Sequence, residues 1–216
     1  HNPFAPPFEF LARTYLPLIG RMGPRVTARL ERHGFYPAGG GRIVVEVEPA
    51  PLVPIELVER GAMRPPRVTA LLANLPDRIA RRELAAVARA LDDGGAEYRT
   101  VRAEGSAGPG NVLLAEIETE AVTTVVAAFG VKGKRAEAVA HEVTEAVAAY
   151  LASDAPVGPH LADQLLVPFA LAGGGVFRAT AWTAHAATNA AVIEDRLGVP
   201  IRAVREPGGA FRVLVG

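Results

Sequence analysis

Apolar and polar positions near the start of the chain predict two helices followed by a strand. Apolar residues recur at near-helical spacing over residues 8–21, which predicts a helix that Pro17 is expected to kink. Pro24 suits the first turn of a second helix, which would end at Gly34. Residues 43–48 alternate between apolar and polar side chains, a pattern typical of a strand.

From about residue 59 the pattern changes and predicts elements in the order β-α-β-β-β-α. Apolar alternation over 68–72 indicates the first strand, Asp77 is placed to cap the first helix, and a turn is expected at Gly94-Gly95. The remaining elements are expected as a strand through Tyr98 and Val101, strands at 111–118 and 122–128, and a helix from about 135 to 152. We expect this block to fold as a compact module.

After a linker at Ser153–Pro159, the last part of the chain again alternates helices with strands. An apolar helix is expected over 160–172, and Gly173-Gly174-Gly175 would end it. The elements expected after it are a strand at 176–181, a helix from His185 or Ala186 to Leu197, and strands at 200–205 and 211–215.

Composition excludes several classes of site. The 216 residues include 23 basic and 23 acidic side chains, so the net charge is zero and nucleic acid would have to bind at a local patch. The absence of cysteine excludes disulfides, thiolate zinc sites and cysteine nucleophiles, and it fits a cytoplasmic protein. We expect no membrane contact, because no apolar run approaches the roughly 20 residues that span a bilayer.

His185 is the most notable side chain for chemistry, because it lies where a strand is predicted to give way to a helix. The free N–H groups at a helix start favour bound anions such as phosphate. Imidazole is also a competent nucleophile when a neighbour fixes its tautomer. A half-buried histidine that is hydrogen-bonded at a helix cap is the alternative interpretation.

Other polar and glycine-rich positions allow two interpretations each. Gly39-Gly40-Gly41 either cradles a phosphate with its backbone or makes a tight turn into the next strand. It is not a P-loop, because no Gly-Lys-Ser/Thr follows. Asp163 either caps its helix or binds a ribose or a metal-associated group. A metal site built from His160, Asp163 and His185 is disfavoured, because their spacing matches no standard zinc pattern.

Four segments in order resemble the RNA 3′-terminal phosphate cyclase family. The most specific is His33-Gly34-Phe35-Tyr36-Pro37-Ala38-Gly39-Gly40-Gly41-Arg42-Ile43, which matches a basic residue, glycine, two variable positions, proline, one variable position and three glycines. The other segments are His1-Asn2-Pro3-Phe4-Ala5-Pro6-Pro7, His160-Leu161-Ala162-Asp163-Gln164-Leu165 and Thr183-Ala184-His185-Ala186-Ala187-Thr188-Asn189. Together they extend over nearly the whole chain.

The resemblance implies a chemistry in three steps. His185 would attack the α-phosphorus of ATP, release pyrophosphate and become adenylylated. The adenylate would move to an RNA 3′-phosphate, and the neighbouring 2′-hydroxyl would then close a 2′,3′-cyclic phosphate and release AMP. A divalent metal, magnesium or manganese, would assist, although its ligands are not identified. The resemblance assigns nucleotide binding to His160, Leu161, Ala162, Asp163, Gln164 and Pro7.

The resemblance also implies an α+β fold. A large domain of repeated βαβαββ units would comprise residues 1–58 and 152–216, with a smaller α/β domain inserted at 59–151. The family's N-terminal portion, which helps to bind metal, ATP and the RNA terminal phosphate, has no counterpart in these residues. We therefore expect the C-terminal part of a cyclase, inactive alone and with exposed apolar faces. Its oligomeric state stays open.

Two other hypotheses compete with a catalytic cyclase. One is a non-catalytic RNA- or ribosome-binding relative that keeps the fold and the histidine. The other is a generic α/β domain, related to the enolpyruvate transferases, whose glycines match by coincidence. Labelling of His185 by nucleotide would separate the first from a cyclase, and nucleotide binding of any kind would exclude the second.

Overall fold

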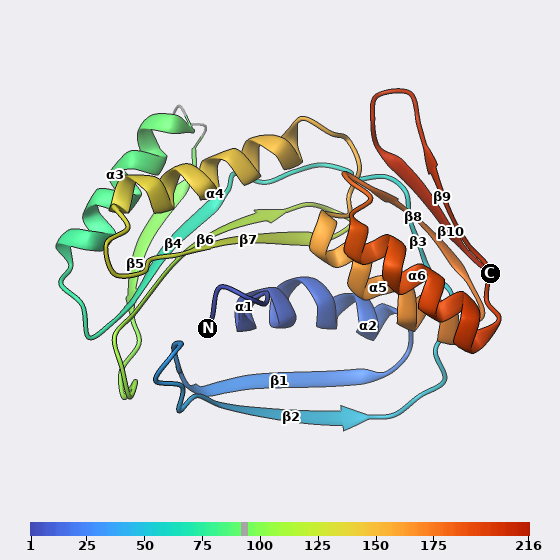
Figure 1. The fold of residues 1–216 in the computed structure, drawn as a ribbon, viewed down its shortest axis with the longest axis horizontal. Coiled ribbons are helices and arrows are strands. Elements are labelled where there is room, and N and C mark those ends of the chain that lie inside the picture. The colour runs from blue at the N-terminus through green and yellow to red at the C-terminus, as the bar shows by residue number, and fades with distance from the viewer. Residues whose placement is uncertain (92–94) are drawn as a thin grey trace.

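The computed structural model describes residues 1–91 and 95–216, in which the strands form two four-stranded sheets and one two-stranded hairpin (Figure 1). The helical elements are α1 Phe8–Phe10, the π-helical turn η1 Leu11–Tyr15, α2 Leu16–Arg21, α3 Arg78–Ala90, α4 Ala136–Leu151, α5 Pro159–Leu171 and α6 Ala184–Leu197. The strands are β1 Arg25–Arg32, β2 Arg42–Glu48, β3 Glu56–Leu57, β4 Arg67–Ala73, β5 Glu97–Arg102, β6 Gly110–Glu118, β7 Thr123–Phe129, β8 Gly175–Ala179, β9 Ile201–Arg205 and β10 Phe211–Val215. This mixture confirms the predicted α+β class. No helix in the described ranges is both long enough and apolar enough to cross a membrane.

Residues 8–21 form one uninterrupted helical segment, as predicted, composed of α1, η1 and α2. Pro17 lies in the first turn of α2, directly after the π-helical turn. The hydrogen-bond pattern therefore changes beside the proline, which has no N–H to donate, although the helix is not broken there. Phe10 and Leu18 are buried and anchor the segment in the core.

The second helix predicted at 24–34 is wrong, because this segment forms strand β1. Val26, Ala28 and Leu30 are half-buried while the residues between them are exposed, so the burial has a period of two. β1 pairs antiparallel with β2, and Val26 lies opposite Val47. Pairing with the following strand thus overrides the local helical signals of Pro24 and Gly34.

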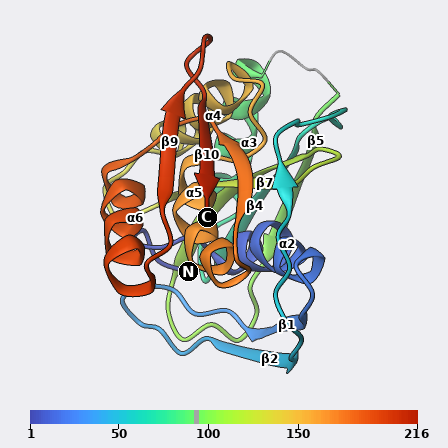
Figure 2. The same cartoon turned by 90° about the vertical axis from the view of Figure 1, so that its right-hand side faces the viewer.

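When residues 59–151 are set aside, strand β3 and the five elements of the C-terminal region follow the order β-α-β-α-β-β: β3, α5, β8, α6, β9 and β10. Their sheet has the strand order β3-β8-β10-β9, with β3 parallel to β8 and the other neighbours antiparallel. Helices α5 and α6 pack side by side against this sheet (Figure 2). The predicted elements of this region are confirmed to within a residue or two at most ends, and the strand predicted at 176–181 ends at Ala179.

The middle block forms the second four-stranded sheet, with the order β5-β4-β6-β7. Its elements β4, α3, β5, β6, β7 and α4 appear in the predicted β-α-β-β-β-α order. Helices α3 and α4 cover one face, where Val87, Val143 and Val147 pack against the sheet and are fully buried. The opposite face packs on the N-terminal helical segment, through contacts of β7 with α1 and η1.

Two local predictions in this block have different outcomes. Asp77 does occupy the position before α3, but its side chain makes no capping hydrogen bond and pairs instead with Arg102. The expected turn at Gly94-Gly95 falls partly outside the described residues, since Gly94 is not among them. Gly95 has a left-handed φ of 78°, which suits a turn.

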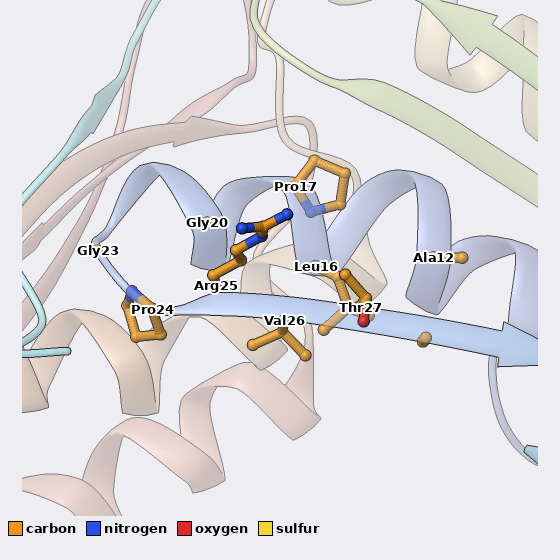
Figure 3. Close-up of a pocket in the computed structure, with 10 residues that line it drawn as sticks. Ala12, Leu16, Pro17, Gly20, Gly23, Pro24, Arg25, Val26 and Thr27 are labelled. Carbon is orange, nitrogen blue, oxygen red and sulfur yellow. The ribbon is translucent and has the colours of Figure 1, made fainter. Parts of the chain in front are cut away.

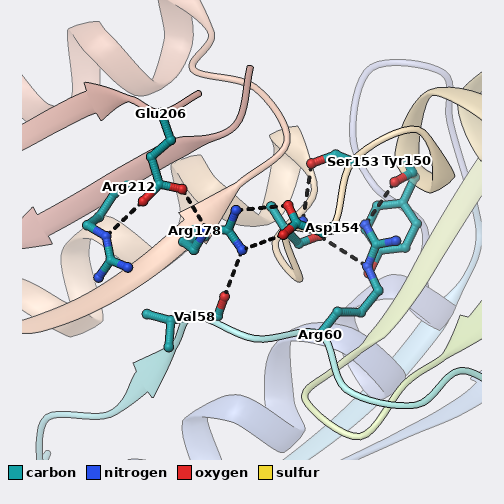
Figure 4. Close-up of polar contacts among 9 residues, drawn as sticks. Val58, Arg60, Tyr150, Ser153, Asp154, Arg178, Glu206 and Arg212 are labelled. Atoms are coloured by element: carbon teal, nitrogen blue, oxygen red, sulfur yellow. Dashed lines mark hydrogen bonds and ion pairs between the residues drawn. The ribbon is translucent and has the colours of Figure 1, made fainter. Parts of the chain in front are cut away.

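The chain enters the middle block at residues 58–60 and leaves it at residues 150–155. A network of arginine contacts joins these two crossings (Figure 4). Arg60, on the incoming crossing, donates hydrogen bonds to the carbonyls of Tyr150 and Ala155 on the outgoing one, at 2.8 and 2.7 Å. Its guanidinium also lies 4.1 Å from the centre of the Tyr150 ring. The two crossings are therefore held against each other.

Arg178 on β8 adds a second set of contacts to this network. Its guanidinium donates to the Val58 carbonyl at 3.2 Å, to both carboxylate oxygens of Asp154 at 3.1 and 2.8 Å, and to Glu206 at 2.7 Å. These contacts raise the pKa of Arg178, with the Asp154 hydrogen bonds the largest cause. The side chain is 15% exposed, so the C-terminal sheet holds both crossings through one largely buried cation.

Replacing Arg178 with alanine should lower the free energy of unfolding by about 2 kcal/mol, because Val58 and Glu206 lose a charged donor in a place with little water. Chemical denaturation of the purified chain measures this loss. Arg64 is the matched control, since its pair with Glu118 at 3.1 Å is exposed and Arg64→Ala should cost less than about 0.5 kcal/mol. Equal losses in both variants would contradict the role given to Arg178.

Candidate nucleotide-binding site

His185 lies in the first turn of α6, as predicted, and its side chain is exposed. Thr183 caps the helix, because its hydroxyl oxygen accepts a hydrogen bond from the Ala186 N–H at 3.1 Å. Ala186 is buried beneath this turn and anchors it. The alternative of a histidine that serves as the cap does not hold, because Thr183 has that role and leaves the imidazole facing solvent.

The segment predicted to bind nucleotide forms the first turns of α5. Gly158 occupies the cap position and Pro159 opens the helix, where its missing N–H costs nothing. His160 is exposed, and Asp163 and Gln164 are half-buried. Leu161 and Ala162 are 2% and 0% exposed, so their side chains fix the helix in the core.

Asn189 joins the starts of the two helices. Its side-chain amide, on α6, donates to the backbone carbonyl of Asp163 and to the Asp163 carboxylate oxygen Oδ1, each at 3.0 Å. Asn189 lies one turn after His185, so the bond sets the histidine-bearing turn against α5. The interpretation of Asp163 as a helix cap is wrong, because Gly158 holds that position and the carboxylate accepts from α6 instead.

Pro7 belongs to a second group of residues, around the glycine-rich segment. It is buried at the start of α1, where its carbonyl accepts the N–H of Phe10 at 3.0 Å. With Gly34, Gly39 and Gly41 it lines a cavity of about 530 Å³. The structure thus brings His160, Asp163, Gln164 and His185 to the paired starts of α5 and α6, and places Pro7 beside the glycines.

The three glycines make the turn that joins β1 to β2. Gly39 and Gly40 have left-handed φ angles of 67° and 75°. A side chain on Gly34 would come within 2.3 Å of the Gly41 nitrogen, so only glycine fits this close approach. The tight-turn interpretation therefore explains the pattern. Arg32 donates to the Gly40 carbonyl at 2.6 Å and holds the turn from outside.

Two histidines lie next to this turn. The His1 imidazole contacts Glu9 at 2.9 Å and stacks with the His33 ring at a centroid distance of 5.4 Å. Burial lowers the pKa of His33, the charge of His1 lowers it further, and the charge of Glu9 opposes both. The turn is thus flanked by a neutral imidazole near physiological pH.

A second hollow carries none of the predicted site residues. It is a groove of about 450 Å³ between α2 and β1, with Pro17, Val26 and Thr27 among its lining residues (Figure 3). Arg25 is the one charged side chain that lines it. Among the described residues that line this groove there is no carboxylate or imidazole to activate the Thr27 hydroxyl, so we place no chemistry there.

Comparison with known proteins identifies the family. The model of the family described as RNA 3′-terminal phosphate cyclase matches residues 1–203. The chain belongs to the RNA 3′-terminal phosphate cyclase family. It is 48% identical over 202 residues to the RNA 3′-terminal phosphate cyclase of Koribacter versatilis (strain Ellin345), covering 93% of this chain and 56% of that protein.

Other cyclases show similar agreement. The enzyme of Ectopseudomonas mendocina (strain ymp) is 45% identical over 201 residues, which cover 93% of this chain and 59% of that protein. The enzyme of Salmonella paratyphi C (strain RKS4594) is 44% identical over 216 residues, which cover 100% of this chain and 62% of that protein. The chain therefore spans less than two thirds of the length of these cyclases.

The described residues do not assemble a metal site for the cyclase reaction. In the ranges 1–91 and 95–216, no three histidine, aspartate or glutamate side chains are placed to hold one ion. His160, Asp163 and His185 accordingly form no such cluster. No ligand of the magnesium or manganese that the resemblance implies is identified among these residues, and we derive no step through it.

Asn189 is the residue of the candidate site that sequence reasoning did not assign. Its sequence signals are its place in the Thr183–Asn189 segment and its position four residues after His185, which puts both side chains on one side of a helix. The donor role toward Asp163 depends on how α5 and α6 pack. It could not be deduced from spacing along the chain.

Changing Asn189 to aspartate should lower the free energy of unfolding by about 2–3 kcal/mol and weaken nucleotide labelling, because a carboxylate would face the Asp163 carbonyl and carboxylate. Asn189→Ala removes the two hydrogen bonds without adding a charge and should cost about 1–2 kcal/mol. Urea denaturation and a labelling assay measure both effects. Val192, an exposed residue of the same helix, is the control, and Val192→Ala should change stability by less than about 0.5 kcal/mol.

Proposed function

We propose that this protein acts as an RNA 3′-phosphate cyclase, a ligase-type enzyme that converts ATP to AMP and pyrophosphate. The observation that carries the proposal is the exposed His185 in the capped first turn of α6, held against α5 by Asn189 and Asp163. A solvent-facing imidazole on a fixed helix start meets the needs of a nucleophile that must approach a phosphate. Membership of the cyclase family supports the same activity.

The first step forms a phosphorus–nitrogen bond. An imidazole nitrogen of His185 attacks the α-phosphorus of ATP, and the bond from that phosphorus to pyrophosphate breaks. The N–H groups of the first turn of α6 favour the negative charge of the phosphate beside them. Thr183 keeps this turn in place through its bond to Ala186.

The next two steps pass the activated phosphate to RNA. An oxygen of the RNA 3′-phosphate attacks the adenylate phosphorus and breaks the bond to His185. The neighbouring 2′-hydroxyl then attacks the 3′-phosphorus and gives up its proton, AMP leaves, and a 2′,3′-cyclic phosphate remains. The binding partner is thus an RNA end that carries a 3′-phosphate.

The nucleotide contacts are assigned to the starts of α5 and α1. His160, Asp163 and Gln164 have side chains that reach the surface, so they are the polar contacts for ATP. Leu161 and Ala162 contribute through the backbone and through packing, because both side chains are buried. Pro7 would contact the adenylate from the cavity that it lines.

We also propose a division into a large domain, residues 1–58 and 152–216, and an inserted domain, residues 59–151. Support comes from the middle sheet, whose strands all lie between Arg67 and Phe129. The arginine network supports it as well, because it joins the chain at Val58–Arg60 to the chain at Tyr150–Ala155, close to both proposed boundaries. The absence of cysteine supports a cytoplasmic location.

The test is an incubation with α-labelled ATP, followed by addition of an RNA that carries a 3′-phosphate. The expected products are label bound to the protein, labelled AMP and an RNA with a cyclic end. If the 216 residues alone take up no label, the assay is repeated with the chain joined to the remaining portion of a curated relative. Failure of both forms to take up label would overturn the proposal.

A further inference from the structure

Two aromatic side chains at the edge of the glycine-rich turn are far more exposed than aromatic residues usually are. Phe4 is 79% exposed and Tyr36 is 63% exposed. Their rings meet edge to face, with centroids 5.5 Å apart and planes at 89°. Exposing large apolar rings to water costs free energy. Two such rings side by side on the surface therefore indicate a binding site for a ligand or partner.

Hydrogen bonds from backbone N–H groups fix the main chain at both residues, and the rings contact each other. The N–H of Phe4 donates to the Asn2 side-chain oxygen at 2.9 Å, which fixes the turn that carries the ring. The N–H of Tyr36 donates to the His1 carbonyl at 3.0 Å, so the two segments are tied together. Rings that are positioned before a ligand arrives lose little conformational entropy on binding.

The surroundings of the pair suit a nucleic-acid ligand. Tyr36 lines the 530 Å³ cavity that Pro7 and the glycines form. Arg32 and Arg42, paired across the ends of β1 and β2, flank the turn. Arg42 contacts Glu31 at 3.0 Å, while Arg32 donates to a carbonyl and has no carboxylate partner among the described residues. Positive charge beside exposed aromatic faces is the combination that binds single-stranded nucleic acid.

We propose that Phe4 and Tyr36 form a stacking site for an unpaired nucleobase. The inference rests on the proposed function, because it takes the base to belong to the RNA near its 3′-phosphate. Aromatic rings bind unpaired bases by stacking on their faces, a contact that every base can make. The adenine of ATP has the same chemistry, so the experiment separates the two sources.

The probe for RNA is a short single-stranded oligoribonucleotide with a 3′-phosphate and 2-aminopurine at its last positions, since stacking quenches the fluorescence of that base. Phe4→Ala and Tyr36→Ala should each weaken binding between about 5-fold and about 150-fold and restore the fluorescence. Tyr36→Phe keeps the ring and should retain quenching. Val131→Ala, at a residue 57% exposed, is the control for loss of surface apolar area.

Parallel measurements of ATP affinity and of His185 labelling complete the test. Weaker RNA quenching with unchanged ATP affinity assigns the base to RNA, and weaker ATP affinity with unchanged RNA quenching assigns it to adenine.

If the wild-type chain takes label but neither alanine variant changes the binding of RNA or of ATP, the stacking site is wrong and the cyclase proposal stands. If the variants abolish quenching while neither the wild-type chain nor the form joined to the remaining portion of a relative takes label, the site stands and the cyclase proposal fails. Alanine variants that only lower thermal stability would show that the rings serve packing and would overturn the site.

Discussion

Replacing His185 with alanine abolishes the transfer of label from α-labelled ATP to the protein, a loss of at least about 10³-fold. The reason is that we assign the imidazole as the nucleophile that forms the new phosphorus–nitrogen bond, and alanine offers no nucleophile in its place. The fold should survive, because His185 is exposed while Thr183 and Ala186 hold the helix start. Acid treatment of the labelled wild-type chain should release the label, as expected for a phosphorus–nitrogen bond.

Two other histidines control this experiment. His141 is also helical and exposed, and it contacts Glu145 at 3.3 Å on α4, so His141→Ala should take up label as the wild-type chain does. His160→Ala should retain label but need more ATP, because we place that side chain against the nucleotide and not at the reacting phosphorus. Label that persists in His185→Ala would assign the nucleophile elsewhere. A loss of label in His141→Ala would indicate general damage to the protein.

Most of the fold could be predicted because its signals are local. Helix α4 has buried valines spaced four residues apart, and α6 has a threonine cap at one end and Gly198, with a left-handed φ of 67°, at the other. Strand β1 could not be predicted in the same way. Val26 and Leu30 fit one face of a helix as well as one face of a strand, and only the pairing of β1 with β2 decides between them.

In the candidate site, too, some features follow from the local sequence and others depend on how separate helices pack. His185 could be found because a strand-to-helix boundary and a short motif both point to it. Its relation to Asp163 could not, because the two residues meet only through the packing of α5 against α6 and the Asn189 side chain. Residues that match a motif are thus easier to find than the residues that hold them in position.

The burial of an ionisable residue, Glu83, also escaped prediction. Glu83 lies on α3 in line with buried Ala80 and Val87, yet it is 0% exposed. Asn111 on β6 donates to its carboxyl oxygen Oε1 at 2.5 Å, while Oε2 has no hydrogen-bond partner in the described residues. Burial raises the pKa of Glu83 to about 7, the hydrogen bond from Asn111 opposes the shift, and the charge of Glu137 adds to it.

This carboxyl should make the protein lose stability as the pH rises. Below pH 4.5, the ordinary value, Glu83 is protonated in both the folded and the unfolded chain and carries no penalty. Between pH 4.5 and about 7 the unfolded chain releases the proton and the folded chain keeps it, so the free energy of unfolding falls. Above pH 7 the loss levels off at about 3 kcal/mol, measured by urea denaturation across this range.

Glu83→Gln should remove this slope, because an amide keeps the acceptor that Asn111 uses and cannot ionise. Near pH 4 the variant should match the wild-type chain, and at pH 8 it should be more stable by up to about 3 kcal/mol. Glu137 on α4 is the control, because its pKa is shifted in the opposite direction. The hydrogen bond from Arg82 lowers the pKa of Glu137, so its contribution is lost as the pH falls. Glu137→Gln should leave most of the loss between pH 4.5 and 7 in place, because burial is the largest cause of the Glu83 shift and the Glu137 charge adds only part of it. A Glu83→Gln variant that follows the wild-type profile at every pH would show that Glu83 ionises in the folded chain without cost, and that its burial against Asn111 does not favour the protonated form.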